Sequence, residues 1–141
     1  MTLRQRQRTL EIATRGVGLY EFTREAIEFV GGAELSTGLC TVFCQHTSCS
    51  LLIQENADPD VQRDLQAFFR RLVPNGDPLF IHTAEGPDDM PAHVKAALTQ
   101  SSLSIPISAG RLALGTWQGI YLFEHRNAPH HRCVILHVVG D

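Results

Sequence analysis

Residues 102–140 read SLSIPISAGRLALGTWQGIYLFEHRNAPHHRCVILHVVG, and this stretch decides the fold class. It holds three runs rich in aliphatic, β-branched and aromatic residues, which are typical of strands: residues 102–108, 111–125 and 132–140. The turn sequences SAGR and RNAPHH join these runs, so the predicted strands follow one another without βαβ alternation. Pro106 has no backbone N–H, and it therefore predicts an edge strand or a bulge in the first run.

The earlier part of the chain adds further short elements. Similar composition predicts strands at residues 8–14, 36–45, 48–56 and 78–82. Helical periodicity and capping residues predict helices at residues 22–32, 57–77 and 90–100. Six to eight strands with two or three helices predict an α+β fold with a largely antiparallel sheet. At 141 residues the chain has the length of a single domain, residues 1–141.

Residue types at the helix ends support these assignments. Thr23 is a plausible N-cap for the first helix, and Gly31 or Gly32 a plausible stop. Asp58 is expected to cap the second helix, with Pro59 at its first position. The apolar stripe of the second helix consists of Val61, Leu65, Phe68, Phe69 and Leu72.

Composition limits the classes of function. The net charge is −3, so no global basic field favours nucleic acid. No apolar run approaches the roughly 18 residues of a membrane span, and no signal-type apolar segment follows the N-terminus. We therefore expect a cytoplasmic protein that binds neither nucleic acid nor membrane. Arg4, Arg6 and Arg8 share one face if extended, where they either contact phosphates or decorate a solvated edge strand.

The four cysteines form no metal or redox motif. None belongs to a CxxC pair. Cys40 and Cys44 lie on one predicted strand and are about 13 Å apart, too far for a disulfide. We expect free, mostly buried thiols in a reducing compartment.

The densest set of metal-type ligands is HTAEGPDDMPAHV, residues 82–94. A strand end and a helix start joined by a short loop can bring His82, Glu85, either Asp88 or Asp89, and His93 into one pocket. Imidazole and carboxylate ligands suit zinc or manganese, and carboxylates alone suit magnesium. The alternative is a capped loop, in which Asp88 or Asp89 is the helix N-cap and the histidines are structural.

Two other segments carry candidate functional residues. In the segment LGTWQGIYLFEHR, Thr116 and Gln118 could hydrogen-bond a substrate, and Trp117 either stacks on a planar ring or belongs to the core. Glu124 at the strand end is a candidate base or metal ligand. His125, His130 and His131 are expected on a surface turn, and His137 in a strand. In HTSCSLLIQEN, His46 ends a strand and Ser48 supplies a hydroxyl, but no GxSxG elbow supports a serine nucleophile.

These segments together closely resemble the YjbQ family, also named secondary thiamine-phosphate synthase. The resemblance rests on HTSCSLLIQENADPDVQRDL, HTAEGPDDMPAHVKAAL and SLSIPISAGRLALGTWQGIYLFEHR, and it covers almost the whole chain. It implies an α+β pseudobarrel or sandwich that assembles as a homotrimer. It also implies transfer of hydroxymethylpyrimidine from its diphosphate to thiazole phosphate, with release of diphosphate.

The residues and the resemblance lead to one hypothesis with two alternatives. His46, His82 and His93 are the predicted metal ligands, and Glu124 or Asp89 is the acid–base or outer partner. Arg126 or Lys95 could meet a phosphate of the substrate, and Trp117 with Gln118 could receive the pyrimidine. The alternatives are a metal-dependent hydrolase of a small phosphorylated or acyl substrate and a non-catalytic ligand-binding trimer. A histidine-rich site favours zinc or manganese over magnesium.

Overall fold

The computed structural model describes residues 2–141 and contains eight strands and three helices in that range. The strands are β1 (Arg4–Thr14), β2 (Gly18–Glu21), β3 (Gly38–Cys44), β4 (Cys49–Glu55), β5 (Ser102–Ser108), β6 (Arg111–Leu112), β7 (Gln118–Glu124) and β8 (His130–Gly140). The helices are α1 (Thr23–Ala33), α2 (Pro59–Leu72) and α3 (Asp89–Leu98). The fold is α+β, as the sequence predicts.

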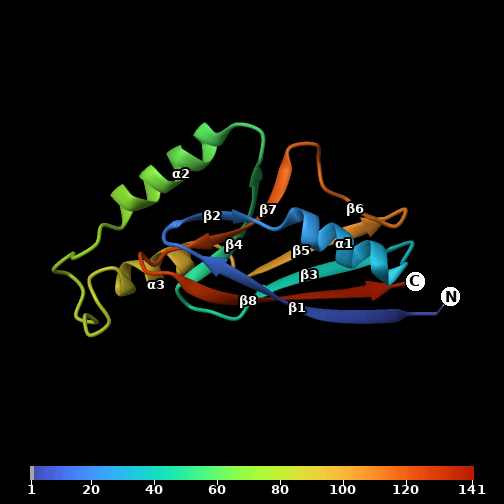
Figure 1. Cartoon of the computed structure of the whole chain (residues 1–141), viewed down its shortest axis with the longest axis horizontal. Helices are drawn as coiled ribbons and strands as arrows, with labels where there is room; N and C mark the ends of the chain where they lie inside the picture. Colours follow the sequence, from blue (N-terminus) through green and yellow to red (C-terminus); the bar gives the residue numbers. More distant parts are fainter. Residues whose placement is uncertain (1) are drawn as a thin grey trace.

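The strands form two antiparallel sheets that lie face to face. The five-stranded sheet has the order β1-β8-β3-β5-β6, and the three-stranded sheet has the order β2-β7-β4. Figure 1 shows the smaller sheet above the larger one, with α1 at one end and both α2 and α3 at the other. The prediction that Pro106 marks an edge strand is wrong, because β5 lies between β3 and the edge strand β6. Pro106 is aligned with Leu39 of β3, and the short β6 pairs only with Ile107 and Ser108 of β5.

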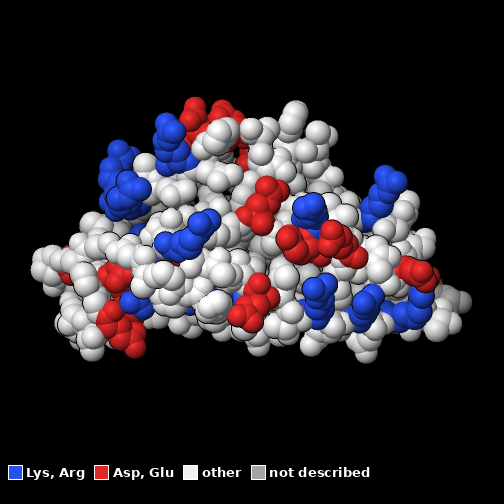
Figure 2. Space-filling model, in the orientation of Figure 1, with Lys and Arg blue, Asp and Glu red and all other residues white. Residues whose placement is uncertain are grey.

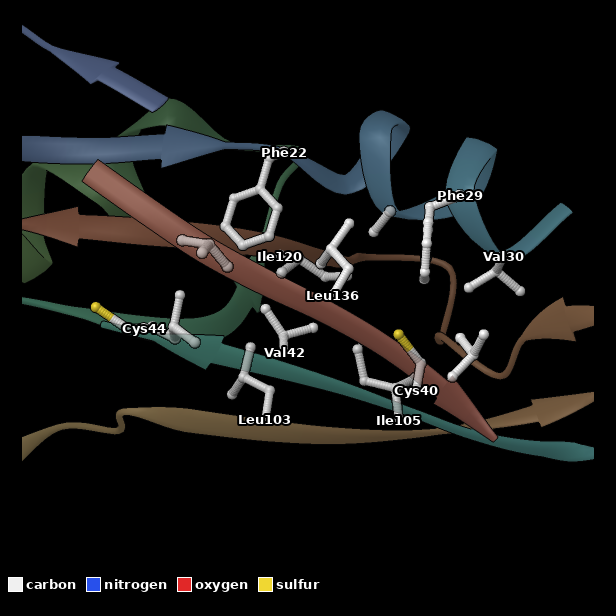
Figure 3. Packing of buried hydrophobic residues seen from close by; sticks show 14 of the residues in the cluster. Phe22, Phe29, Val30, Cys40, Val42, Cys44, Leu103, Ile105, Ile120 and Leu136 are labelled. Atoms are coloured by element: carbon white, nitrogen blue, oxygen red, sulfur yellow. The ribbon is translucent and has the colours of Figure 1, made fainter. Parts of the chain in front are cut away.

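One hydrophobic core fills the space between the sheets and α1. Alternate residues of β5 point inward, and Leu103, Ile105 and Ile107 are buried while the serines and the proline between them are exposed. Figure 3 shows Phe22 and Phe29, at the start of α1 and within it, packing toward the side chains of the sheets. This core fixes the ends of the strands from which the polar segments emerge.

The strand predictions hold with two corrections. The run 111–125 is interrupted: residues 113–117 form a loop between β6 and β7. Residues 78–82 form no strand, because Leu79 and Ile81 are 77% and 96% exposed and no neighbouring strand pairs with them. β2, which the sequence did not indicate, pairs with β7.

The helix ends differ in how well the residue types predict them. Asp58 caps α2 as expected: its side chain accepts a hydrogen bond from the Asp60 N–H at 2.9 Å. Thr23 does not cap α1, because its hydroxyl bonds Glu21 and the Ile120 N–H instead. The predicted glycine stop of α1 is wrong as well, since the helix continues to Ala33 and a left-handed Glu34 ends it.

The arginines of β1 pack onto α1. The Arg4 Nη2 atom donates to the Glu34 carbonyl at 2.5 Å, and the Arg6 guanidinium lies 5.6 Å from the centre of the Phe29 ring. A side chain at Gly32 would stand 2.9 Å from the Arg6 Nη1 atom, which explains a glycine on this face of the helix. Figure 2 shows the basic side chains following the edge formed by β1.

All four cysteines are free thiols. Cys44 and Cys49 lie on the facing strands β3 and β4 with their sulfurs 3.5 Å apart. Burial raises the pKa of Cys40 to about 11, so this thiol is protonated at neutral pH. Within residues 2–141 no helix is long and apolar enough to span a membrane.

Candidate functional site

The loop before α3 and the first turn of this helix bring four ligand-type residues together. The Oδ2 atom of Asp89 lies 2.7 Å from the Nε2 atom of His82 and 3.1 Å from the Nε2 atom of His93. The Oε2 atom of Glu85 lies 4.0 Å from the same His82 nitrogen. All four ligand atoms lie within 4.8 Å of one another. We call His82, Glu85, Asp89 and His93 the four-residue cluster.

Local geometry explains why these side chains converge. Asp89 and His93 are one helical turn apart, at positions i and i+4, and therefore share a face of α3. The loop turns back at Gly86, whose φ of +106° favours glycine and whose N–H bonds the Thr83 carbonyl at 3.1 Å. This turn places His82 over the beginning of α3.

The expectation that an aspartate caps this helix is wrong. Asp88 occupies the N-cap position with helical angles, φ −96° and ψ −7°, and its side chain makes no capping bond. Its Oδ2 atom instead accepts from the Arg126 Nε at 3.1 Å and from the Asn127 N–H at 2.9 Å. Arg126 also donates to the Asp89 Oδ1 at 2.6 Å and to the Glu85 carbonyl at 3.0 Å. Arg126 thus holds the loop and the helix start together.

Asp89 is ionised in this setting. The side chain is only 2% exposed, and burial alone would raise the pKa of Asp89. The hydrogen bond from His82 and the charges of His93 and Arg126 outweigh burial and lower this pKa to about 2. A buried carboxylate thus faces two imidazole rings at neutral pH.

The contact of His93 with Thr47 leaves the other ring nitrogen facing Asp89. The Nδ1 atom of His93 lies 2.8 Å from the Thr47 carbonyl oxygen, which can only accept, so Nδ1 carries a hydrogen. In a neutral ring Nε2 then presents a lone pair to an Asp89 carboxylate oxygen 3.1 Å away. A metal ion between the two atoms would accept both lone pairs. The Thr47 carbonyl therefore orients His93 as a metal-ligating histidine is usually oriented.

Two cavities flank the four-residue cluster. One of about 300 Å³ includes His82 in its lining, together with residues of the loop and the start of α3. The other, of about 280 Å³, lies between His93 and the segment that begins at His46. A small molecule in either cavity would meet an imidazole of the cluster.

The structure does not bring His46 into the four-residue cluster. Its Nε2 atom accepts from the Cys133 N–H at 2.8 Å, and its Nδ1 atom lies 3.5 Å from the Arg132 Nη1. The Nε2 lone pair is therefore used within the fold, and a neutral ring then carries its hydrogen on Nδ1. Burial is the first cause that lowers the pKa of His46, followed by the Arg132 charge.

Glu124 and Ser48 belong to a closed buried network. Glu124 is 0% exposed and binds the Arg132 guanidinium through both carboxylate oxygens, at 2.7 and 2.5 Å. Thr14 donates to Glu124 at 2.6 Å, and Ser48 accepts from Arg132 at 2.9 Å. Burial raises the pKa of Glu124, but the bonds from Arg132 and Thr14 lower it below its ordinary value. The arrangement is that of a satisfied ion pair.

The GTWQ segment lies at the other end of β7 from Glu124 and Arg126. Gln118 and Glu124 are six positions apart, which is about 20 Å along a strand. Trp117 is 62% exposed, so the interpretation that it belongs to the core is wrong. Thr116 is also exposed, and the Gln118 side chain accepts from the Gly115 N–H at 2.7 Å. Within one chain these three residues do not adjoin the four-residue cluster.

The prediction that His125 lies on a surface turn is wrong. This residue is 1% exposed, with its Nε2 atom 2.8 Å from the Ser50 hydroxyl. Its Nδ1 atom has no hydrogen-bond partner among residues 2–141. Burial, and next the Lys95 charge, lower the pKa of His125 to about 3. His125 ends the run IYLFEH, which begins with four apolar residues. Extending the buried strand to the end of this run was the signal available in the sequence.

Comparison with known proteins gives a consistent result. The family described as UPF0047 protein YjbQ-like matches residues 8–141. A UPF0047 protein of Synechocystis sp. is 55% identical over 99% of this chain and 95% of its own length. The UPF0047 protein YjbQ of Escherichia coli O157:H7 is 39% identical over 96% of this chain and 98% of its own length.

Solved structures show the same fold. A conserved hypothetical protein of Thermus thermophilus has a TM-score of 0.80 at 37% identity, covering 90% of this chain and 96% of that one. A protein of unknown function from Sulfolobus solfataricus has a TM-score of 0.91 at 18% identity, covering 99% of this chain and all of that one. At the latter identity the likeness concerns the fold alone.

Proposed function

The chain belongs to the UPF0047 YjbQ-like family, and we propose that it is a metal-dependent enzyme acting on a small phosphorylated substrate. The observation that carries the proposal is the four-residue cluster, in which one buried carboxylate joins two imidazoles beside a second carboxylate. The first reaction to test is the thiamine-phosphate synthase reaction that the family resemblance implies.

The donor set fits a divalent ion. Ligand atoms bound about 2.1 Å from one ion lie roughly 3.0–3.4 Å apart. The Asp89 oxygen is 2.7 and 3.1 Å from the two imidazole nitrogens, so small shifts suffice. Glu85 has a side chain that is 65% exposed and can move the remaining distance. Two imidazoles with carboxylates favour zinc or manganese over magnesium.

In this assignment each residue has a defined task. His82, Asp89 and His93 hold the ion, and Glu85 completes the set. Arg126 keeps Asp89 oriented and neutralises part of its charge. When bound, the ion would withdraw charge from a phosphate oxygen. His46, Glu124 and Ser48 maintain the fold around the site and take no part in binding the ion.

The synthase reaction would place demands on the flanking cavities. The thiazole nitrogen forms a bond to the methylene carbon of the pyrimidine as the carbon–oxygen bond breaks, and diphosphate leaves with the electron pair. Cationic donors are needed where this charge develops. The lining of the cavity beside His82 contains no lysine or arginine. That observation favours a second candidate, hydrolysis of a small substrate, and among phosphorylated and acyl substrates it favours the acyl ones, from which no phosphate charge develops.

We further propose that the active form is the homotrimer implied by the resemblance. A single chain leaves large apolar side chains exposed, among them Leu79, Ile81 and Trp117. Association would cover such side chains, and it is also the arrangement in which a GTWQ segment could approach the four-residue cluster of another copy. Sedimentation of wild type and of Ile81→Asp tests this: we expect a trimer that dissociates on substitution. A wild-type monomer would contradict it.

The decisive experiment measures metal content and products together. Tag-free protein purified without added metal is expected to contain about one zinc or manganese per chain. His82→Ala and His93→Ala should lose the metal, whereas His46→Ala, a matched control, should retain it. Reactions of the metal-loaded protein are then analysed for thiamine phosphate and for released phosphate or acid.

Three results would overturn the proposal. Wild type that neither contains metal nor takes it up on titration lacks the site. Equal metal loss in His46→Ala would show that the loss reflects the fold. Variants at His82 or His93 that melt earlier while no turnover is found with any substrate class would indicate a structural ligand site.

A further inference from the structure

We propose that a third cavity, between α2, α3 and the end of β7, binds a phosphate group, either as inorganic phosphate or as a small phosphomonoester. The cavity measures about 270 Å³, and its lining includes Arg70, Lys95, His125 and two asparagines but no acidic residue. Figure 1 shows α2 and α3 at the same end of the molecule, as this lining requires.

The cavity is separate from the four-residue cluster. Lys95 follows His93 by two positions on α3, which is about 200° around the helix axis. The two side chains therefore leave opposite faces of α3, and none of the four cluster residues lines this cavity. The inference does not depend on metal binding or on the proposed reaction.

Lys95 supplies a buried positive charge without a counter-ion. The residue is 5% exposed, yet among residues 2–141 no carboxylate lies within 4.0 Å of its ammonium group. The Asp88 carboxylate acts on it through space but is already occupied by Arg126 and the Asn127 N–H. Most of the Lys95 side chain is removed from water while its ammonium has no acidic partner, and Arg70, an exposed residue in the same lining, adds a second cation. An anion in the cavity would satisfy both.

His125 adds a directional donor. Its Nε2 atom lies 2.8 Å from the Ser50 hydroxyl, and when Ser50 donates in this contact the hydrogen of the ring is on Nδ1. That nitrogen is buried and has no partner in the described chain. Two cations, an imidazole N–H and the amides of Asn75 and Asn127 together match the charge and the several acceptor oxygens of phosphate. The volume suits a phosphate or a small ester of it.

The test titrates metal-free protein with inorganic phosphate at constant ionic strength, by calorimetry and by nitrogen NMR of the histidines. Wild type should bind one phosphate per chain with a shift of the His125 signals. Arg70→Gln should weaken binding about tenfold or more. Arg71→Gln removes the same charge from the next residue, which is exposed like Arg70 but does not line the cavity, and should change the affinity less than about twofold. Lys95→Met should abolish saturable binding.

The contrary outcomes are distinct. Absence of saturation in wild type, or equal weakening by Arg70→Gln and Arg71→Gln, overturns the site. Loss of binding in His82→Ala would place the phosphate at the four-residue cluster instead. If Lys95→Met does not fold, the comparison of Arg70→Gln with Arg71→Gln still decides whether the phosphate site exists. Glycerol phosphate distinguishes the two forms of the ligand: tighter binding than inorganic phosphate identifies a phosphomonoester, and weaker binding identifies free phosphate.

Discussion

Two helices of this protein begin after an aspartate, and each uses that residue differently. Asp58 has extended backbone angles, and its side chain caps α2 through the Asp60 N–H. Asp88 has helical angles and leaves the α3 amides uncapped, while its carboxylate binds Arg126 and the Asn127 N–H. The next residue, Asp89, reaches two histidines. Similar local sequences thus give a local bond in one helix and long-range bonds in the other.

Burial explains the difference. No residue of α2 is fully buried, and its contact with the sheet runs through half-buried side chains such as Phe69, whose ring lies 5.4 Å from that of Phe123. The capping bond at its start therefore supplements a limited packing contact. Asp89, Pro91, Ala92 and Lys95 of α3 are buried, so packing holds that helix in place. A helix held by packing leaves its first acidic side chains available for other partners. In α3 the two aspartates at the helix start are thus the residues that reach Arg126 and the histidines of the four-residue cluster.

The largest effect is expected on substitution of Glu124. This substitution tests whether a buried carboxylate is by itself evidence of a functional site. Glu124→Gln leaves the 4% exposed Arg132 without a full counter-charge. The free energy of unfolding in urea should fall by about 3–5 kcal/mol, with metal content per folded chain unchanged. The exposed Glu11→Gln, a matched control, should change it by less than about 0.5 kcal/mol. A loss of similar size in both variants would contradict the buried ion pair.

A smaller, pH-dependent effect is expected at Asp89. Its pKa is lowered from 3.8 to about 2, so the ionised carboxylate stabilises the fold above pH 3.8 and this contribution is lost as the pH falls toward 2. At pH 7, Asp89→Asn should lower the free energy of unfolding by about 2 kcal/mol. Urea unfolding should be measured from pH 7 to pH 2. The difference in free energy of unfolding between Asp89→Asn and wild type should shrink below about pH 4. A difference that stays constant would refute this role.

Removal of the α2 cap should cost less. Asp58→Ala leaves the Asp60 N–H without its side-chain acceptor and should lower the free energy of unfolding by about 1 kcal/mol. Asp64→Ala, in the exposed middle of the same helix, serves as the control and should stay within about 0.5 kcal/mol of wild type. Equal effects of the two substitutions would mean that Asp58 contributes only its charge.

The smallest effect is expected at Pro59, the first residue of α2. Pro59→Ala restores backbone freedom to the unfolded chain, and it should lower the free energy of unfolding by about 0.5 kcal/mol. Thermal unfolding by circular dichroism measures the shift. A higher melting temperature in the variant would show that the proline strains this helix start.

Much of the fold follows from local patterns. The long strands and α2 were predictable because alternation, a capping aspartate and a proline at the first position act within a few residues. β2 was missed because its four residues carry too little pattern, and it is defined by its pairing with β7. Residues 78–82 have the composition of a strand, but composition cannot supply a pairing partner. Isolated apolar residues in that loop remain exposed.

The candidate site was predictable only where its members are close in sequence. His82, Glu85, Asp89 and His93 fall within twelve residues, and the loop and helix bring them together. His46 is similar in type, but pairing of the facing strands directs its ring to the Cys133 N–H. Glu124 and Arg132 meet across a turn, and their mutual pairing is a property of the folded sheets. Sequence spacing does not reveal such distant contacts.

The arginines of β1 have a consequence for the protein in concentrated solution. β1 forms one edge of the five-stranded sheet, and beyond it the sheet has no further strand among residues 2–141. Such an edge can act as a template on which strands of other molecules add one after another into fibrils. Arg4, Arg6 and Arg8 place like charges along this edge, and an approaching copy would bring the same three charges against them. The β1 edge therefore repels the β1 edge of another copy, and strands of other copies do not add to the sheet beyond β1.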